Sequence, residues 1–108
     1  MLTTTTDTID GCEIVDYLGI VTGECVTGAN ILRDMMATVT DYVGGRSAAY
    51  EEELAKARQS ALDEMCDRAR VMGANAVVGI SLDYETIGGR GAMLLVTGTG
   101  TAVRMRKR

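Results

Sequence analysis

The clearest pattern in the chain is an apolar stripe with helical spacing over residues 48–72. Residues that recur every three or four positions lie on one face of an α-helix, and here they are Tyr50, Leu54, Ala57, Ala61, Met65, Ala69 and Met72. Glu64 and Arg68 have the spacing of an i,i+4 ion pair on such a helix, and Gly73 follows as a stop signal. The pattern predicts one long helix whose small alanines need a closely packed partner.

A shorter helical pattern comes before the long one. Ile31, Met35, Val39 and Val43 recur at every fourth position, which gives one apolar stripe. Asn30 suits the N-cap of this helix, and two glycines follow its last turn. We therefore expect a first helix over residues 30–43.

The N-terminal part of the chain has the composition of β-strands. Residues 13–27 are rich in Ile, Val, Thr and Tyr, and glycines at 19 and 23 interrupt them. They form either one long bent strand or two short strands. Residues 3–6 are four threonines, which suit a short edge strand followed by a turn.

Two further strands are predicted at the C-terminal end, over residues 76–86 and 92–105. The glycine-rich residues 88–91 join them as an antiparallel hairpin. In the first strand, alternation puts Val78, Ile80, Leu82 and Tyr84 on one face and Gly79, Ser81, Asp83 and Glu85 on the other. In the second strand, we expect Gly98 and Gly100 to lie under the long helix, against Ala57 and Ala61.

The order β-α-α-β-β predicts a single α+β domain over residues 1–108. Its mainly antiparallel, three-stranded sheet carries the helices on one face. The second face of the sheet still holds Leu, Ile, Val and Met residues. Small domains usually cover such a face by assembling, so the pattern predicts a homo-oligomer.

Composition limits the chemistry of this domain. The 108 residues contain no histidine, so imidazole takes no part in catalysis or in metal binding. The net charge of −4 argues against general nucleic-acid binding, and the basic residues 104–108 suit a solvated tail. The chain has no apolar run long enough for a membrane helix and no basic, apolar leader at its start. We therefore expect a cytoplasmic protein without a membrane partner.

Several short runs resemble a known family in the same order along essentially the whole chain. They are Gly28-Ala29-Asn30, Gly44-Gly45-Arg46-Ser47, Tyr50-Glu51, Gly73-Ala74-Asn75-Ala76-Val77-Val78-Gly79, Asp83-Tyr84-Glu85 and Gly100-Thr101-Ala102-Val103. They resemble the YbjQ-like family of small bacterial and archaeal proteins, which is labelled as heavy-metal-binding and has no established reaction. The resemblance implies an α+β subunit assembled as a homopentameric ring, and a metal ion as ligand.

Carboxylates in or near these runs are the first candidate metal ligands. Asp83 and Glu85 are two positions apart on one predicted strand, so they point to the same face, and Glu24 lies on another strand of the sheet. Oxygen ligands of this kind suit a divalent metal ion. The alternative is a solvated sheet face or salt bridges between subunits.

A second candidate site lies around the start of the long helix, where Arg46, Tyr50, Glu51 and Arg58 gather. A helix N-terminus beside two glycines suits an anion such as phosphate. The alternative is a contact between subunits or an Arg–Glu pair within the helix.

The three thiols, Cys12, Cys25 and Cys66, are the last candidates. They are widely spaced and odd in number, which predicts no disulfide framework. A free cysteine is most often a small, buried and inert side chain. A thiolate metal site is possible only if a ring brings equivalent cysteines of several copies together.

From these observations we expect a non-enzymatic homo-oligomeric binding module, with a divalent metal ion as its ligand. The alternative is a structural or interaction ring that binds a protein partner and no small ligand. An enzyme that uses carboxylates and tyrosine at subunit interfaces is a third, weaker hypothesis, because no catalytic constellation is visible.

Overall fold

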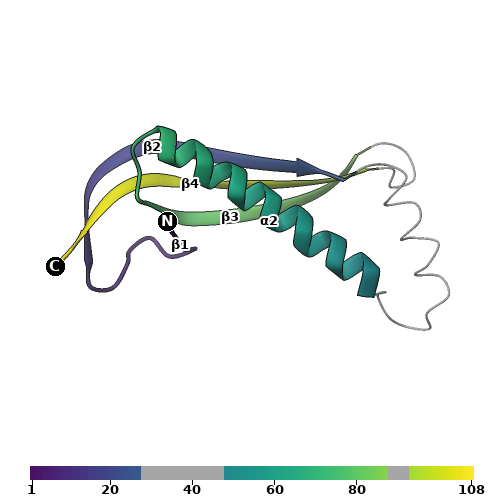
Figure 1. Cartoon of the computed structure of the whole chain (residues 1–108), viewed down its shortest axis with the longest axis horizontal. Helices are drawn as coiled ribbons and strands as arrows, with labels where there is room; N and C mark the ends of the chain where they lie inside the picture. The colour runs from purple at the N-terminus through teal and green to yellow at the C-terminus, as the bar shows by residue number, and fades with distance from the viewer. Residues whose placement is uncertain (28–47, 88–92) are drawn as a thin grey trace.

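The computed structural model describes residues 1–27, 48–87 and 93–108. Four strands form one mixed sheet in the order β1-β3-β4-β2 (Figure 1). They are β1 (Leu2–Thr3), β2 (Cys12–Val26), β3 (Ala76–Ile87) and β4 (Met93–Lys107). The central strand β4 is antiparallel to both β2 and β3, and β1 runs parallel to β3. The predicted α+β class and the antiparallel hairpin are confirmed, with the short N-terminal strand as a fourth member of the sheet.

The long helix α2 (Ala48–Val71) lies across one face of this sheet, as predicted (Figure 1). Glu64 and Arg68 form the expected ion pair, with 2.8 Å between Arg68 Nη2 and Glu64 Oε1. The helix predicted over residues 30–43 and the turn over residues 88–91 lie outside the described residues. No helix in the described part of the chain is long and apolar enough to cross a membrane.

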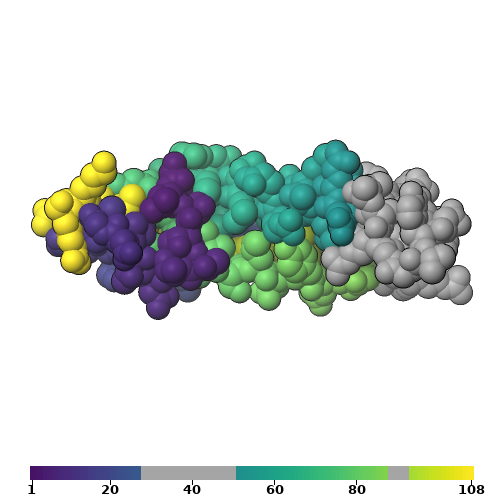
Figure 2. Space-filling model, turned by 90° about the horizontal axis from the view of Figure 1, so that it is seen from below, coloured from purple at the N-terminus to yellow at the C-terminus, as the bar shows by residue number. Residues whose placement is uncertain are grey.

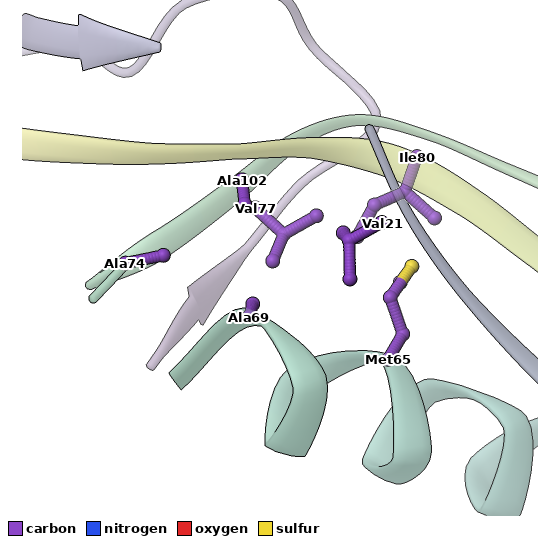
Figure 3. Close-up of a cluster of buried hydrophobic side chains, with 7 residues drawn as sticks. All are labelled: Val21, Met65, Ala69, Ala74, Val77, Ile80 and Ala102. Carbon is purple, nitrogen blue, oxygen red and sulfur yellow. The ribbon is translucent and has the colours of Figure 1, made fainter. Parts of the chain in front are cut away.

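The main core lies between α2 and the sheet (Figure 3). Met65 and Ala69 point from the helix toward Val21 of β2 and Val77 of β3. Met65, Ala69 and Val77 are fully buried. A neighbouring cluster joins Ala57 and Ala61 of α2 to Leu94 and Val96 of β4, with Leu54 and Cys25 packed against it. The part of the predicted stripe from Leu54 to Ala69 is therefore the face of α2 that covers the sheet, whereas Met72 follows the end of the helix.

The closest approach between α2 and the sheet is at Gly23 of β2, not at Gly98 and Gly100. A Cβ atom placed on Gly23 would meet the carbonyl oxygen of Ala61 and would lie 2.7 Å from the backbone nitrogen of Met65. A Cβ on Gly98 would instead meet the side chain of Leu82 at 3.3 Å. The predicted contact of Ala57 and Ala61 with Gly98 and Gly100 is wrong, because α2 passes directly over β2.

The strand β2 is one continuous strand with two irregularities in its pairing. Of the two predicted alternatives, one long bent strand is therefore correct and two short strands are not. The pairing with β4 shifts register between Ile14 and Asp16 and again between Tyr17 and Gly19. Gly19 has a φ of 135°, a conformation that favours glycine. The glycine at 19 therefore marks the bend, and the glycine at 23 provides room for the helix.

The strand β3 contains a bulge that simple alternation does not predict. Its pairing with β4 shifts between Val78 and Ser81, and Gly79 has a φ of 62°. The extra residue exchanges the faces of the strand, so Val78 and Ile80 belong to different clusters. The expectation that Val78 shares a face with Ile80 is therefore wrong, because the alternation restarts after Gly79.

The face of the sheet opposite α2, here termed the open face, is covered at one end. There Ile9 from the N-terminal segment packs against Ala76, Val78 and Val103. Ile14 and Met105 complete this smaller cluster. Beyond it, no described element covers the open face.

Candidate functional site

The predicted metal ligands Glu24, Asp83 and Glu85 all lie on the open face. Glu24 follows Gly23, which faces α2, so its side chain points away from the helix. Tyr84 faces the helix, because its hydroxyl accepts a hydrogen bond from Arg58 Nη1 of α2 at 3.3 Å. Asp83 and Glu85 flank Tyr84 on β3 and therefore also point away. All three carboxylates are on exposed residues.

The central strand β4 separates these carboxylates within one chain. Thr97 of β4 lies opposite both Glu24 of β2 and Asp83 of β3. Neighbouring strands lie about 4.8 Å apart, so the two acidic residues are roughly 10 Å from each other. Bonds from a divalent cation to carboxylate oxygens are only about 2.0–2.6 Å long. Accordingly, the described residues contain no group of three His, Cys, Asp or Glu side chains that could hold a metal ion.

Residues with hydroxyl side chains lie between and beside the carboxylates on the open face. Thr22 of β2, Thr99 of β4 and Ser81 of β3 lie opposite one another across the three strands. Thr97 and Thr101 extend the row along β4, and all three threonines of this strand are partly buried. This row was not predicted, although the alternation Thr-Gly-Thr-Gly-Thr over residues 97–101 is a sequence signal for it. The open face thus presents oxygen atoms, with acidic groups on both outer strands.

The outer edge of β2 is capped by two side chains of α2. Glu64 Oε1 accepts a hydrogen bond from the backbone N–H of Glu24 at 3.3 Å. Arg68 Nη1 donates to the carbonyl oxygen of Thr22 at 3.0 Å. The ion pair between Glu64 and Arg68 therefore supplies an acceptor and a donor where a neighbouring strand would otherwise supply them. The i,i+4 spacing predicted the ion pair but not its contact with the strand.

The second candidate site, at the start of α2, is only partly described. Arg46 and the side chain of Tyr50 lie outside the described residues. Glu51 is exposed in the first turn, and Arg58 turns toward Tyr84 of β3. The anion site therefore stays a prediction.

The three cysteines are free thiols in separate surroundings. Cys25 packs against the cluster of Ala57 and Ala61 between the helix and the sheet. Cys12 lines a surface groove with Asp10 and Tyr17, and Cys66 lines another between β1 and α2. Cys25 thus fits the interpretation of an inert packing residue, and one chain offers no pair of thiolates for a soft metal.

Comparisons with known proteins agree along the whole chain. A family model described as "Putative heavy-metal-binding" matches residues 1–106. UPF0145 protein BH1111 of Halalkalibacterium halodurans is 55% identical over 108 residues, which cover 100% of this chain and 99% of that protein. A crystal structure of a protein of unknown function of the DUF74 family from Pediococcus pentosaceus is 18% identical, with a TM-score of 0.60. It covers 98% of both chains, and at this identity it shows a shared fold alone.

Proposed function

Because the chain belongs to the YbjQ-like family, whose members are described as heavy-metal-binding, we propose that it is a homo-oligomeric module that binds a divalent metal ion. The observation that carries the proposal is the arrangement of Glu24, Asp83 and Glu85 on one uncovered face of the sheet. We propose five copies in a ring, the assembly that the family resemblance implies. We assign no catalytic role to it and place it in the cytoplasm, where free thiols persist.

Self-assembly is supported by the apolar residues that one copy leaves exposed. Ile20 of β2 is 81% exposed and Val26 is 52% exposed, and both point to the open face, as Glu24 does. Large apolar side chains that gather next to an uncovered sheet face mark interaction surfaces. A second copy on this face would remove them from water.

The donor atoms on the open face determine which metal fits. Carboxylates and hydroxyls are hard ligands that suit Mg²⁺, Ca²⁺ or Mn²⁺. Soft heavy metals prefer thiolate or imidazole, but the chain has no histidine and its three cysteines lie apart. The residues present therefore fit an oxygen-preferring divalent cation better than a soft heavy metal. Because β4 separates Glu24 from Asp83, we propose that the site is completed by a second copy.

The test is metal binding by the full chain, measured by calorimetry with Mg²⁺, Ca²⁺, Mn²⁺ and Zn²⁺ after dialysis against a chelator. We expect binding of at least one of the first three ions, weakened at least tenfold by Glu24→Gln or Asp83→Asn. Glu52→Gln on the exposed surface of α2 is the matched control, and it should bind like the parent. No binding of any of the four ions by the parent, or unchanged binding by the two open-face variants, would overturn the metal assignment.

The alternative function is a ring that presents its surface to a protein partner and binds no small ligand. It is favoured by the lack of a three-ligand group within the described residues of one chain. An assembled parent that binds none of the four cations would support this alternative. A monomeric parent would contradict both functions.

A further inference from the structure

Charged side chains of α2 contact both outer strands of the sheet, close to the carboxylates of the open face. On β2, Glu64 Oε1 accepts a hydrogen bond from the backbone N–H of Glu24 at 3.3 Å. Arg68 Nη1 donates to the carbonyl oxygen of Thr22, two residues before Glu24, at 3.0 Å. The helix therefore holds the backbone of β2 around a residue that carries one proposed metal ligand.

A third contact is on β3, the outer strand on the other side of β4. Residues 81–87 of β3 extend beyond the pairing with β1. Here Arg58 Nη1 donates to the hydroxyl of Tyr84 at 3.3 Å, and Tyr84 lies between Asp83 and Glu85, the two other proposed ligands. Figure 2 shows α2 and β3 side by side at the surface.

An outer strand needs such contacts because it has a neighbouring strand on one side only. Its outward N–H and C=O groups have no partner in the sheet, and segments with exposed backbone groups open locally at little cost in free energy. A cation site demands more order, since its ligands must be held within about 0.5 Å of their binding positions. Contacts that fix a strand from the opposite face of the sheet meet this demand without touching the ion.

We propose that Arg58, Glu64 and Arg68, here termed the α2 clamp, are positioning residues of the divalent-cation site. They hold β2 at Glu24 and β3 at Tyr84, while the carboxylates bind the ion on the opposite face. This inference rests on the proposed function, because it assigns further residues to that same site. The clamp acts within each copy, so the site needs it whichever copy supplies the other ligands.

Charge distinguishes the clamp from a simple electrostatic effect of the helix. The arginines of α2 repel a bound cation, so Coulomb's law alone predicts that Arg68→Ala tightens cation binding. Loss of the clamp predicts the opposite, because the backbone of Thr22 is released. Tyr84→Phe removes the acceptor of Arg58 with no change in charge, so any effect of this variant comes from the contact itself.

The test is the dissociation constant of the full chain for whichever of Mg²⁺, Ca²⁺ and Mn²⁺ the parent binds most tightly, measured by calorimetry. We expect Glu64→Ala, Arg68→Ala and Tyr84→Phe each to weaken binding about threefold to tenfold, the range that one lost hydrogen bond explains. Glu64→Gln keeps an acceptor oxygen for the N–H of Glu24, so it should bind within about twofold of the parent.

Two exposed residues of α2 provide charge-matched controls. Asp63→Ala removes an acid, as Glu64→Ala does, but Asp63 accepts its hydrogen bond from Gln59 of the same helix. Lys56→Ala removes a cation, as Arg68→Ala does, and Lys56 pairs with acids within the helix. Both controls should bind within about twofold of the parent, because salt screens exposed charges.

The outcomes separate the clamp from the proposed function. A parent that binds none of the cations overturns the proposed function, and the clamp with it. If the parent binds and any of Glu64→Ala, Arg68→Ala or Tyr84→Phe binds as tightly, the clamp alone is overturned. Equal weakening by Glu64→Gln and Glu64→Ala also contradicts it, since charge and not the acceptor would then matter. Far-UV circular dichroism checks folding; if an alanine variant is unfolded, Tyr84→Phe, which deletes a single oxygen atom, decides the question.

Discussion

The contact between α2 and the sheet at Gly23 predicts a large effect of adding a single methyl group. In Gly23→Ala the new Cβ would meet the carbonyl oxygen of Ala61 and lie 2.7 Å and 2.9 Å from the backbone nitrogen and Cβ of Met65. These are helix backbone atoms or atoms fixed to the backbone, so a change of rotamer cannot relieve the overlap. The helix as a whole must move away from β2.

The size of this movement determines how much folding stability Gly23→Ala loses. Non-bonded heavy atoms rest at about 3.5–4.0 Å, so α2 must retreat by roughly 1 Å over β2, and a gap of that size forfeits a quarter to a half of the dispersion energy of each separated pair. Ala57, Ala61, Met65 and Ala69, all buried against the sheet, lose contact together. Overpacking of this kind costs about 3 kcal/mol, the upper part of its usual range. In a domain of this size that corresponds to a fall in Tm of about 12–24 °C.

Gly98→Ala is the matched control for this experiment. Gly98 lies opposite Gly23 in the sheet, but its added Cβ would meet only the ends of flexible side chains, Leu82 Cδ2 at 3.3 Å and Met65 Cε at 3.8 Å. We expect its free energy of unfolding to stay within about 1 kcal/mol of the parent. Both variants are compared by urea denaturation at one protein concentration, since assembly links stability to concentration. Equal stability of Gly23→Ala and Gly98→Ala would refute the close approach at Gly23.

Three further predictions concern the core, a buried hydroxyl and the bulge. Met65→Ala removes a fully buried side chain and should lower the free energy of unfolding by about 2–5 kcal/mol in the same urea assay; a loss below 1 kcal/mol would contradict its place in the core. Thr27→Val leaves the N–H of Leu94 without its 3.1 Å acceptor and should cost about 1–3 kcal/mol, whereas Thr27→Ser should retain most of the stability. Gly79→Ala should lower the free energy of unfolding by about 1–2 kcal/mol, because alanine disfavours the positive φ of this position. The added Cβ itself has room, since its one near neighbour is Asp7 Oδ1 at 3.8 Å. An unchanged midpoint of urea denaturation would argue against the bulge.

Local patterns predicted the elements of this fold well. The stripe from Leu54 to Ala69 has helical spacing because one helix face covers the sheet, and β4 alternates because only one of its faces meets that helix. The same period of two placed Asp83 and Glu85 on one face, and the structure places Glu24 on it as well. These features depend on residues near one another in the sequence, so the sequence alone was sufficient for them.

Features that depend on distant partners were not predictable in the same way. The alanines of α2 indicated that the helix approaches a glycine of the sheet closely. Because the helix passes over β2, that glycine is Gly23 and not Gly98. At Gly79 the bulge forms where carbonyl oxygens of the N-terminal segment accept from residues 79 and 80. A glycine at this position of a strand gives no sign of such a partner. Likewise, only the strand order shows that β4 separates Glu24 from Asp83.

The proposed function requires that this chain works as an assembly of identical copies. Multi-angle light scattering of the full chain at several concentrations tests it most directly. We expect a mass that is a multiple of the chain mass of 11.5 kDa, and five times that mass for the proposed ring. A single species at 11.5 kDa at every concentration, with and without divalent cations, would contradict it.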